Sequence, residues 1–321
     1  MSRWIGLTAM LALASFGACG DDDSGTPPDS GDTTETADDV GTPDVYDTPA
    51  DEAAPPDTPV DVPADTPADM PTDTPSDATP GDPMPDDTRI IYLHHSTGGV
   101  IWGGGVPDEV TTYNTANGTT YEITERAYPS GDPYPWANYP YDYWNIWINN
   151  EGSATYMEEE TLELLTPQYG VIVFKHCFPV SGIEADTGSP DITSETKSLE
   201  NYHLQYEALK TKMRSFPGNR FLVWTGAALT AANTDADQAA RAREFFEWVK
   251  NTWDEPGDNI FVWDFFELET AGGNVLLDSN AEAPDNSHPN AAFAARVAPL
   301  FVNRLVSVIR GTGDTTSLTG E

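Results

Sequence analysis

The chain has 321 residues, and its 53 Asp and Glu against 15 Lys and Arg give a formal net charge of −38. A chain this acidic would repel the phosphates of DNA or RNA, so we expect no nucleic-acid partner. The acidic residues are concentrated in residues 20–87, which contain no Lys or Arg. The remaining length is enough for one large domain or two small ones.

Residues 1–19 have the composition of an export signal, in which Arg3 precedes an apolar run and Gly17 and Ala18 precede Cys19. A positive start, an apolar core and small residues before the cleavage point are typical of secretory signals. The cysteine after the small pair resembles the lipobox of bacterial lipoproteins, which implies acylation of Cys19. We therefore expect a lipid anchor in a membrane and a location at the cell envelope or cell surface. An ordinary secretory signal is the alternative.

Residues 20–87 are a low-complexity tract of Asp, Thr and Pro with approximate repeats such as DTPAD and DTPSD. Few apolar side chains and many charges leave nothing to offset the entropy of the chain. The tract is expected to be a disordered linker that holds a domain away from the membrane. At the other end, residues 311–321 are expected to form a flexible tail.

Residues 88–310 alternate between two kinds of segment, which predicts a single α/β domain with a parallel sheet covered on both faces. Short β-branched or aromatic runs predict five strands, and longer mixed segments predict helices between them. Ligands of such sheets bind at the carboxyl ends of the strands. The expected strands are 89–94, 120–127, 171–176, 220–225 and 260–265, and the expected helices are 155–165, 195–216, 236–253 and 291–310.

The first expected strand ends in the sequence HHSTGG, residues 94–99. A glycine-rich turn after a first strand can bind a nucleotide, but the segment lacks both the G-x-G-x-x-G pattern and the lysine of a phosphate loop. It also lacks the G-x-S-x-G pattern of a nucleophile elbow. What remains is Ser96 at the tip of a strand, next to small residues that let the backbone approach a substrate.

A partner for this serine lies near the C-terminus, in the sequence DNSHP at residues 285–289. Asp285 and His288 are three residues apart, so in a turn the carboxylate can hold one imidazole nitrogen while the other faces a nucleophile. Pro289 suits the first turn of the final helix. A serine needs such a base because its hydroxyl is a weak nucleophile.

The first-strand serine and the D-x-x-H sequence together resemble the SGNH/GDSL hydrolase superfamily over about residues 88–310. The resemblance implies a three-layer, flavodoxin-like domain with about five parallel strands and no metal or organic cofactor. It also implies the roles of the three residues. Ser96 would be the nucleophile, His288 the general base and acid, and Asp285 the carboxylate that orients the histidine.

The chain departs from the family at two motifs. His94 and His95 replace the Gly-Asp of the signature before the serine, and residues 175–179 (KHCFP) replace the Gly-x-Asn-Asp motif after the third strand. In the family, that Asn and a glycine after the second strand donate hydrogen bonds to the oxyanion. The candidate donors here are the Ser96 amide, Gly131 and His176.

Other reactive side chains have simpler interpretations. His94 and His95 are adjacent on a strand and point to opposite faces, so we do not expect metal binding, and we expect one of the two to pack under the serine turn. His203 is expected to be structural or exposed. Cys177 could be a nucleophile, but a buried thiol at a strand end is expected. Ser181 is an alternative serine with no argument beyond its position.

Residues 134–147 (YPWANYPYDYWNIW) are rich in Tyr and Trp. Amphipathic rings of this kind can stack on sugars, so Trp136 and Trp144 are candidate substrate-binding residues; a buried buttress of the sheet edge is the equal alternative. Asp264, at the end of the fifth expected strand, is a candidate for the same cleft, although a capping role is the more common one.

These observations predict a surface-tethered serine esterase that hydrolyses ester bonds, with O-acyl groups on extracellular carbohydrate as the expected substrates. Lipid or small esters are the other substrates that the chemistry allows. The alternative is a surface protein that keeps the hydrolase scaffold, binds carbohydrate, and has weak activity or none.

Overall fold

The computed structural model describes residues 81–135 and 137–321, and a five-stranded parallel sheet lies at their centre. The strand order is β2-β1-β3-β4-β5, which is the flavodoxin-like order. The predicted α/β class and the five-stranded parallel sheet are therefore confirmed. The strands are β1 (Arg89–His94), β2 (Glu122–Ala127), β3 (Val171–Phe174), β4 (Arg220–Trp224) and β5 (Ile260–Trp263).

The sheet is buried on both faces because the inner strands carry apolar side chains on each of their two faces. In β1, Ile91 and Leu93 pack into one hydrophobic cluster, while Ile90 and Tyr92 pack into another on the opposite face. Strands β3, β4 and β5 divide their residues in the same way. Strand β2 is the partly exposed edge of the sheet. Two apolar faces on each inner strand require two layers of helices.

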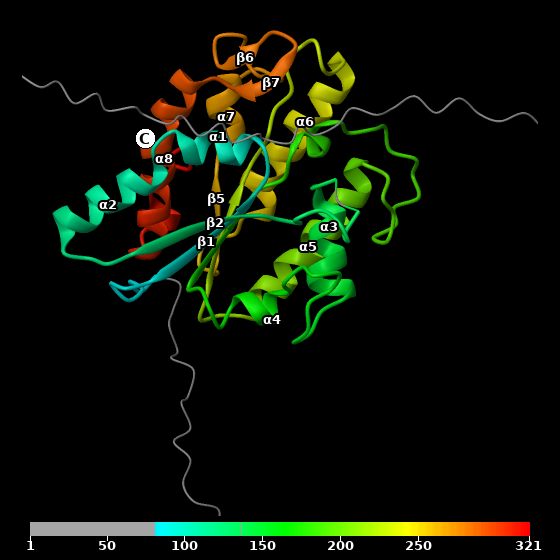
Figure 1. The fold of residues 1–321 in the computed structure, drawn as a ribbon. Helices are drawn as coiled ribbons and strands as arrows, with labels where there is room; N and C mark the ends of the chain where they lie inside the picture. The colour runs from blue at the N-terminus through cyan, green and yellow to red at the C-terminus, as the bar shows by residue number, and fades with distance from the viewer. Residues whose placement is uncertain (1–80, 136) are drawn as a thin grey trace, which may run out of the picture. The chain divides into compact units, whose positions relative to one another are not determined.

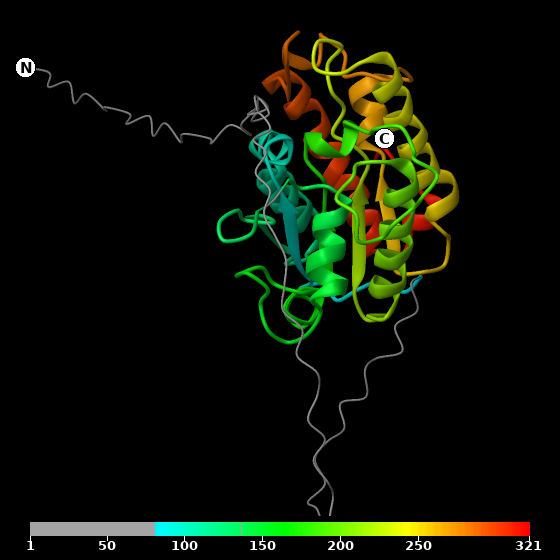
Figure 2. The same cartoon turned by 90° about the vertical axis from the view of Figure 1, so that its right-hand side faces the viewer.

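The helices form those two layers (Figure 1). Helices α3 (Pro140–Trp144), α5 (Leu199–Arg214) and α6 (Ala236–Trp248) supply the first cluster, and α2 (Val106–Asn117) and α8 (Ala291–Ile309) supply the second. Figure 2 shows α3 and α5 in front of the strands and the red helix α8 behind them. The remaining elements are α1 (Thr97–Gly103), α4 (Leu162–Leu165), α7 (Phe265–Thr270), β6 (Ala281–Ala283), β7 (Asn286–Pro289), the 3₁₀ helices η2 (Phe178–Ser181) and η4 (Gly313–Thr315), and the π-helical turns η1 (Asn145–Asn149) and η3 (Val249–Trp253).

Several boundaries differ from those expected. The helix predicted over 155–165 is reduced to α4, and α1, α2, α3 and α7 were not expected. Pro289 does not open the last helix, because it belongs to β7, which pairs antiparallel with β6. Asn290 is the N-cap of α8 instead, and its side chain accepts a hydrogen bond from Phe293 N at 2.9 Å.

Described residues of both segments that were expected to be flexible contact the domain. In the linker predicted over 20–87, residues 81–87 contact the domain: Met84 N donates to Ile309 O at 2.8 Å, and Asp86 forms an ion pair with Arg310. The predicted tail 311–321 packs beside β5, where Asp264 N donates to Leu318 O at 2.9 Å. The sequence does not predict these contacts, because they depend on which surface each segment packs against. The signal segment, Cys19 and the rest of the linker lie outside the described residues.

Among the described residues, one helix is long and apolar enough to cross a membrane, namely α8. Phe293, Val297, Phe301 and Leu305 are buried in it and pack against the sheet. The apolar length of α8 is therefore accounted for by the core of the domain.

Candidate active site

Ser96 lies where β1 ends and α1 begins, at the carboxyl edge of the sheet. Its backbone has φ 46° and ψ −103°, a region that residues with a Cβ rarely adopt. Backbone strain of this kind persists where the surrounding fold imposes it, and it concentrates at functional sites. The turn therefore presents a half-buried hydroxyl at the end of a buried strand, as the sequence predicted.

Gly98 allows this turn to close. A Cβ at this position would lie 2.5 Å from His94 Cβ and 2.6 Å from the Tyr92 hydroxyl. A side chain there would have to displace the core of β1. The small residue is thus required for packing under Ser96. The expected approach of a substrate to this turn stays a prediction.

The tertiary structure brings Ser96 and His288 together, although they are 192 residues apart in the chain. Ser96 Oγ and His288 Nε2 form a hydrogen bond. His288 lies on β7, and β7 packs against α1, the helix that follows the serine (Figure 1). A hydroxyl bound to an imidazole nitrogen is the arrangement in which histidine can remove the serine proton.

The third residue of the site is Asn286, and the expected contact of Asp285 with His288 is not formed. His288 Nδ1 is 2.8 Å from Asn286 Oδ1, which also accepts from His288 N at 3.0 Å. Asp285 is exposed. The reason is that Asn286 and His288 are two residues apart on β7 and therefore share a face, whereas Asp285 lies in the turn before this strand. Asp285 was expected to face His288 because the whole segment was taken as one turn, and the structure makes residues 286–289 a strand.

The orientation of the Asn286 amide is fixed by Glu282 on the paired strand β6. Asn286 Nδ2 donates to Glu282 Oε2 at 3.0 Å, and a carboxylate can only accept. The amide oxygen must therefore face the histidine. His288 then carries its proton on Nδ1, and Nε2 is left to accept from Ser96. The four side chains form one chain of hydrogen bonds from Ser96 to Glu282.

The surroundings of His288 favour its neutral form. Burial lowers the pKa of His288, and the positive charge of Lys175 lowers it further, while Glu282 acts in the opposite direction. The ring of Phe178 packs edge-on against the imidazole, with the ring centroids 5.0 Å apart. A neutral imidazole with Nε2 aimed at a hydroxyl is ready to act as a base near neutral pH.

Three further polar residues surround the serine turn. Lys175 is fully buried at the end of β3, and its Nζ donates to His95 O at 3.3 Å. His94 Nε2 hydrogen bonds to Glu125 Oε2 at 2.9 Å, and the ring of His95 hydrogen bonds to Pro129 O. His94 also lies against Gly98 under the serine turn, as expected for one of the two histidines.

The three predicted oxyanion donors have different outcomes. Gly131 lies in the loop after β2, with φ 105° and its carbonyl bonded to Tyr134 N, so its role stays a prediction, as does that of the Ser96 amide. His176 is fully buried, and its Nε2 hydrogen bonds to Tyr206 Oη at 2.8 Å. It lies in the core beside α5, so it is not an oxyanion donor.

The predicted substrate-binding residues are mostly structural. Trp144 is 6% exposed and packs on Tyr141, with ring centroids 5.7 Å apart. Asp264 caps α7, accepts from Thr225 Oγ1 at 2.9 Å, and forms an ion pair with Lys250. Both side chains make their contacts inside the domain, so neither can bind substrate. Trp136 lies outside the described residues.

The two alternative nucleophiles are also buried in the domain. Cys177 is fully buried, as expected. Ser181 is 2% exposed and donates to Ala227 O at 2.5 Å. Ser96 is therefore the one serine among these candidates that contacts a histidine. Asn286, Glu282 and Lys175 were not predicted, and only the proximity of Asn286 to His288 in the sequence could have indicated one of them.

No protein-family model matches the chain, and no curated protein matches it. Among solved structures, the chain is similar to a gut microbial diltiazem-metabolizing enzyme, with a TM-score of 0.42 and 13% identity over 72% of this chain and 48% of that chain. It is also similar to a carbohydrate esterase family 2 enzyme with a carbohydrate binding domain from Corynascus thermopiles (Myceliophthora fergusii), with a TM-score of 0.34 and 11% identity over 71% of this chain and 68% of that one. The chain thus spans about half the length of the first neighbour. At these values neither neighbour assigns a family or an activity to this chain.

Proposed function

We propose that the protein is a serine esterase in which Ser96 attacks the carbonyl carbon of an ester. His288 Nε2 takes the hydroxyl proton as the new C–O bond forms, and then delivers it to the leaving alcohol as the tetrahedral intermediate collapses. In the second half of the reaction, His288 takes a proton from water as the water attacks the acyl carbonyl. His288 then returns this proton to Ser96 Oγ as the C–O bond to the serine breaks and the acid leaves. The observation that carries the proposal is the hydrogen bond from Ser96 to His288 at the carboxyl edge of the sheet.

Asn286 holds the imidazole in the correct tautomer, and Glu282 holds Asn286. An amide does not carry the negative charge that a carboxylate would place beside the imidazolium. It does supply the geometric part of the same role, as an asparagine does in papain-like proteases. The amides of Ser96 and Gly131 are the proposed donors to the oxyanion.

The proposed substrates are O-acyl groups on extracellular carbohydrate. The proposed location is the outer face of a membrane, through a lipid on Cys19. The support for the location is the sequence of residues 1–19 and the length of the acidic tract that follows it. Radiolabelled fatty acid incorporated into the wild type and not into Cys19→Ser would test the anchor.

The decisive experiment is labelling by a fluorophosphonate probe, together with turnover of p-nitrophenyl acetate. The wild type is expected to be labelled, while Ser96→Ala loses labelling and at least about 10³-fold in kcat/KM, because the nucleophile is removed. Ser189→Ala, which changes an exposed serine, is the matched control and retains both signals. Labelling that survives in Ser96→Ala would refute the assignment.

A scaffold with weak activity or none is the second candidate. It is favoured by Asn286, which stands where a carboxylate would stabilise the imidazolium. If folded wild type is neither labelled nor active on any short-chain p-nitrophenyl ester, this candidate replaces the first.

A further inference from the structure

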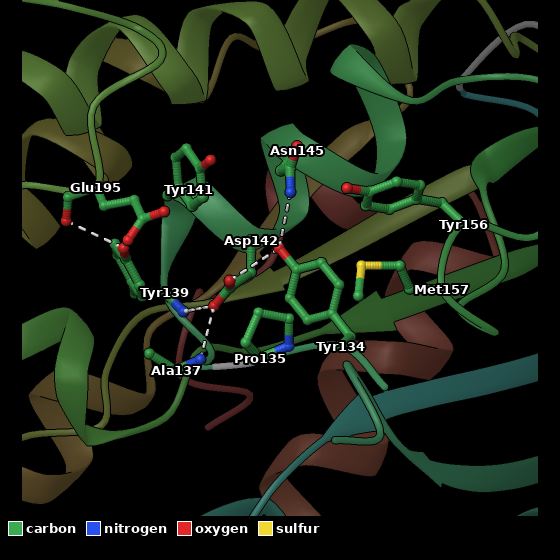
Figure 3. A pocket seen from close by; sticks show the side chains of 10 residues that line it. All are labelled: Tyr134, Pro135, Ala137, Tyr139, Tyr141, Asp142, Asn145, Tyr156, Met157 and Glu195. Carbon is green, nitrogen blue, oxygen red and sulfur yellow. Dashed lines mark hydrogen bonds between the residues drawn. The ribbon is translucent and has the colours of Figure 1, made fainter. Parts of the chain in front are cut away.

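A cavity of about 310 Å³ lies beside α3, in a part of the molecule that the proposed reaction does not use. Figure 3 shows the side chains around it, which come from the loop before α3, from α3 and η1, and from two later loops. Tyrosine rings make up most of the wall. The lining residues are Tyr134, Pro135, Ala137, Tyr139, Tyr141, Asp142, Asn145, Tyr156, Met157 and Glu195.

The floor of the cavity is rigid because its polar groups are satisfied by the protein. Asp142 accepts from the Tyr134 hydroxyl at 3.0 Å and from the amides of Ala137 and Tyr139, both at 3.2 Å. Asn145 Nδ2 donates to the Tyr134 hydroxyl at 3.2 Å (Figure 3). A ligand would therefore meet ring faces at the floor rather than unpaired charges.

The rim of the cavity has polar groups that are still available to a ligand. Tyr141 and Tyr156 are half-buried, Glu195 is exposed, and their hydroxyls and carboxylate hydrogen bond to no described residue. The rim thus offers two phenol hydroxyls, which donate and accept, and one carboxylate, which accepts. Flat apolar walls with a few convergent polar groups are typical of small-ligand sites.

The charges around the cavity disfavour an anionic ligand. Lys197 Nζ lies over the Tyr139 ring, 5.4 Å from its centroid, and offsets part of the negative charge of the lining carboxylates. An anionic ligand would be repelled by Asp142 and Glu195, which line the cavity, and by the net charge of the chain.

We infer that the cavity is a subsite for one unit of a neutral carbohydrate, in which the rings of Tyr141 and Tyr156 stack on the sugar and the rim groups bind its hydroxyls. Tyr134 and Tyr139 are 2% and 5% exposed and support these rings from below. As the place where an acylated carbohydrate is held, the subsite rests on the proposed esterase function.

The loop between β2 and α3 connects the cavity with the surroundings of Ser96. Near its start, Pro129 O hydrogen bonds to the ring of His95, the residue before Ser96. Further along the loop, Tyr134, which lines the cavity, donates its N–H to Gly131 O.

The test uses full-length Ser96→Ala, so that binding is measured without turnover. The probes are neutral xylo-, cello-, manno- and galacto-oligosaccharides, presented as an array and then titrated by calorimetry, with tetramethylammonium chloride as the cationic probe. Binding of at least one oligosaccharide series and none of tetramethylammonium is the expected result. Tyr141→Ala should weaken that binding at least 10-fold, and Glu195→Gln should weaken it several-fold.

Tyr113→Ala is the matched control, because it removes a half-buried ring on α2 that stacks on Tyr121 away from the cavity. Its affinity is expected to equal that of the parent. Equal affinity in Tyr141→Ala, Tyr156→Ala and Glu195→Gln, or no binding of any neutral probe at millimolar concentration, would overturn the inference. If a sugar binds but the wild type is not labelled by fluorophosphonate, the subsite stands and the esterase is refuted. If the wild type is labelled but no sugar binds, the esterase stands and the subsite is refuted.

Discussion

His288 illustrates how a single hydrogen bond defines the chemistry of this site. Its Nδ1 faces the amide oxygen of Asn286 at 2.8 Å, while the neighbouring Asp285 faces solvent. An amide oxygen fixes the tautomer but leaves the imidazolium without an anion in direct contact, since Glu282 lies one hydrogen bond further away. The catalytic contribution of Asn286 is therefore one of orientation.

Substitutions at these two neighbouring residues are expected to have different effects. Asn286→Ala should lower kcat/KM for p-nitrophenyl acetate by about 10- to 100-fold, because the imidazole loses its orienting partner. Asp285→Asn should stay within about twofold, since this side chain does not contact the site. Stopped assays on both variants at pH 8, with circular dichroism to confirm folding, make the comparison. The opposite ranking would restore Asp285 as the third residue.

The pH dependence of the reaction follows from the state of His288. Only the neutral imidazole can accept the serine proton, so activity rises as pH rises through the pKa of His288. Burial and Lys175 lower that pKa, which places the acid limb of kcat/KM below the ordinary histidine value of about 6.5. A carboxylate beside Nδ1 favours the imidazolium, so Asn286→Asp should move the limb to higher pH. A limb above 6.5 in the wild type would contradict this.

At the scale of elements, the C-terminal segment, residues 311–321, packs against β5 and α8 and is not a free tail. Arg304 in α8 is 1% exposed, and its guanidinium donates to Gly313 O at 2.5 Å and Thr316 Oγ1 at 3.1 Å. Trp263 Nε1 donates to Thr319 O at 3.0 Å. The segment therefore supplies hydrogen-bond acceptors to the buried guanidinium of Arg304 and to Trp263 at the end of β5.

Deletion of residues 312–321 should lower the free energy of unfolding by about 2–4 kcal/mol, because donors of Arg304 and of β5 lose their acceptors. Urea unfolding followed by tryptophan fluorescence measures the change. Removal of the exposed Glu321 alone is the control and should cost less than about 0.5 kcal/mol. A full deletion as stable as the control would show that the segment is dispensable.

The β6–β7 hairpin shows the same dependence on context. Its short strands were not predicted, because residues 281–289 contain no clear alternation of apolar and polar side chains. Pairing of Ala281 with Pro289 and of Ala283 with Asn286 nevertheless makes the segment extended. That extension is what aligns Asn286 with His288 and brings Glu282 to Asn286.

At the scale of the whole molecule, one buried acid links stability to pH. Glu269 in α7 is fully buried, accepts from Ala228 N at 2.7 Å, and has no partner among the described residues for its second oxygen. Burial raises the pKa of Glu269 to about 8, from an ordinary value of 4.5. The folded protein thus keeps a proton that the unfolded chain releases, so stability falls as pH rises from about 4.5 to about 8.

Glu269→Gln removes this titration and is expected to become more stable, relative to the wild type, as pH rises from 5 to 9. Any cost of the unpaired amide is the same at every pH and does not change this trend. Urea unfolding at pH 5, 7 and 9 measures it. Asp108→Asn, which changes an exposed acid in α2, is the control and should show a difference that does not depend on pH. A constant difference for Glu269→Gln would refute the buried proton.

The sequence by itself determined the α/β class, the five parallel strands and the two ends of the site. Buried strands are short apolar runs whose identity is local, and Ser96 and His288 lie in segments where reactive side chains stand out. It also indicated that one of His94 and His95 would pack under the turn, since adjacent strand residues point to opposite faces.

Only the tertiary structure decided which neighbour of His288 completes the site, whether His176 reaches the oxyanion, and whether the aromatic residues after β2 are core or surface. Each of these depends on the direction of a side chain, and direction is set by the parity of a strand or by the partner that packs against it. Asn286 and His288 share a face of β7 because they are two residues apart in it, whereas Asp285 lies in the turn that precedes the strand. Residue types and spacings do not contain that information; the pairing of β6 with β7 does.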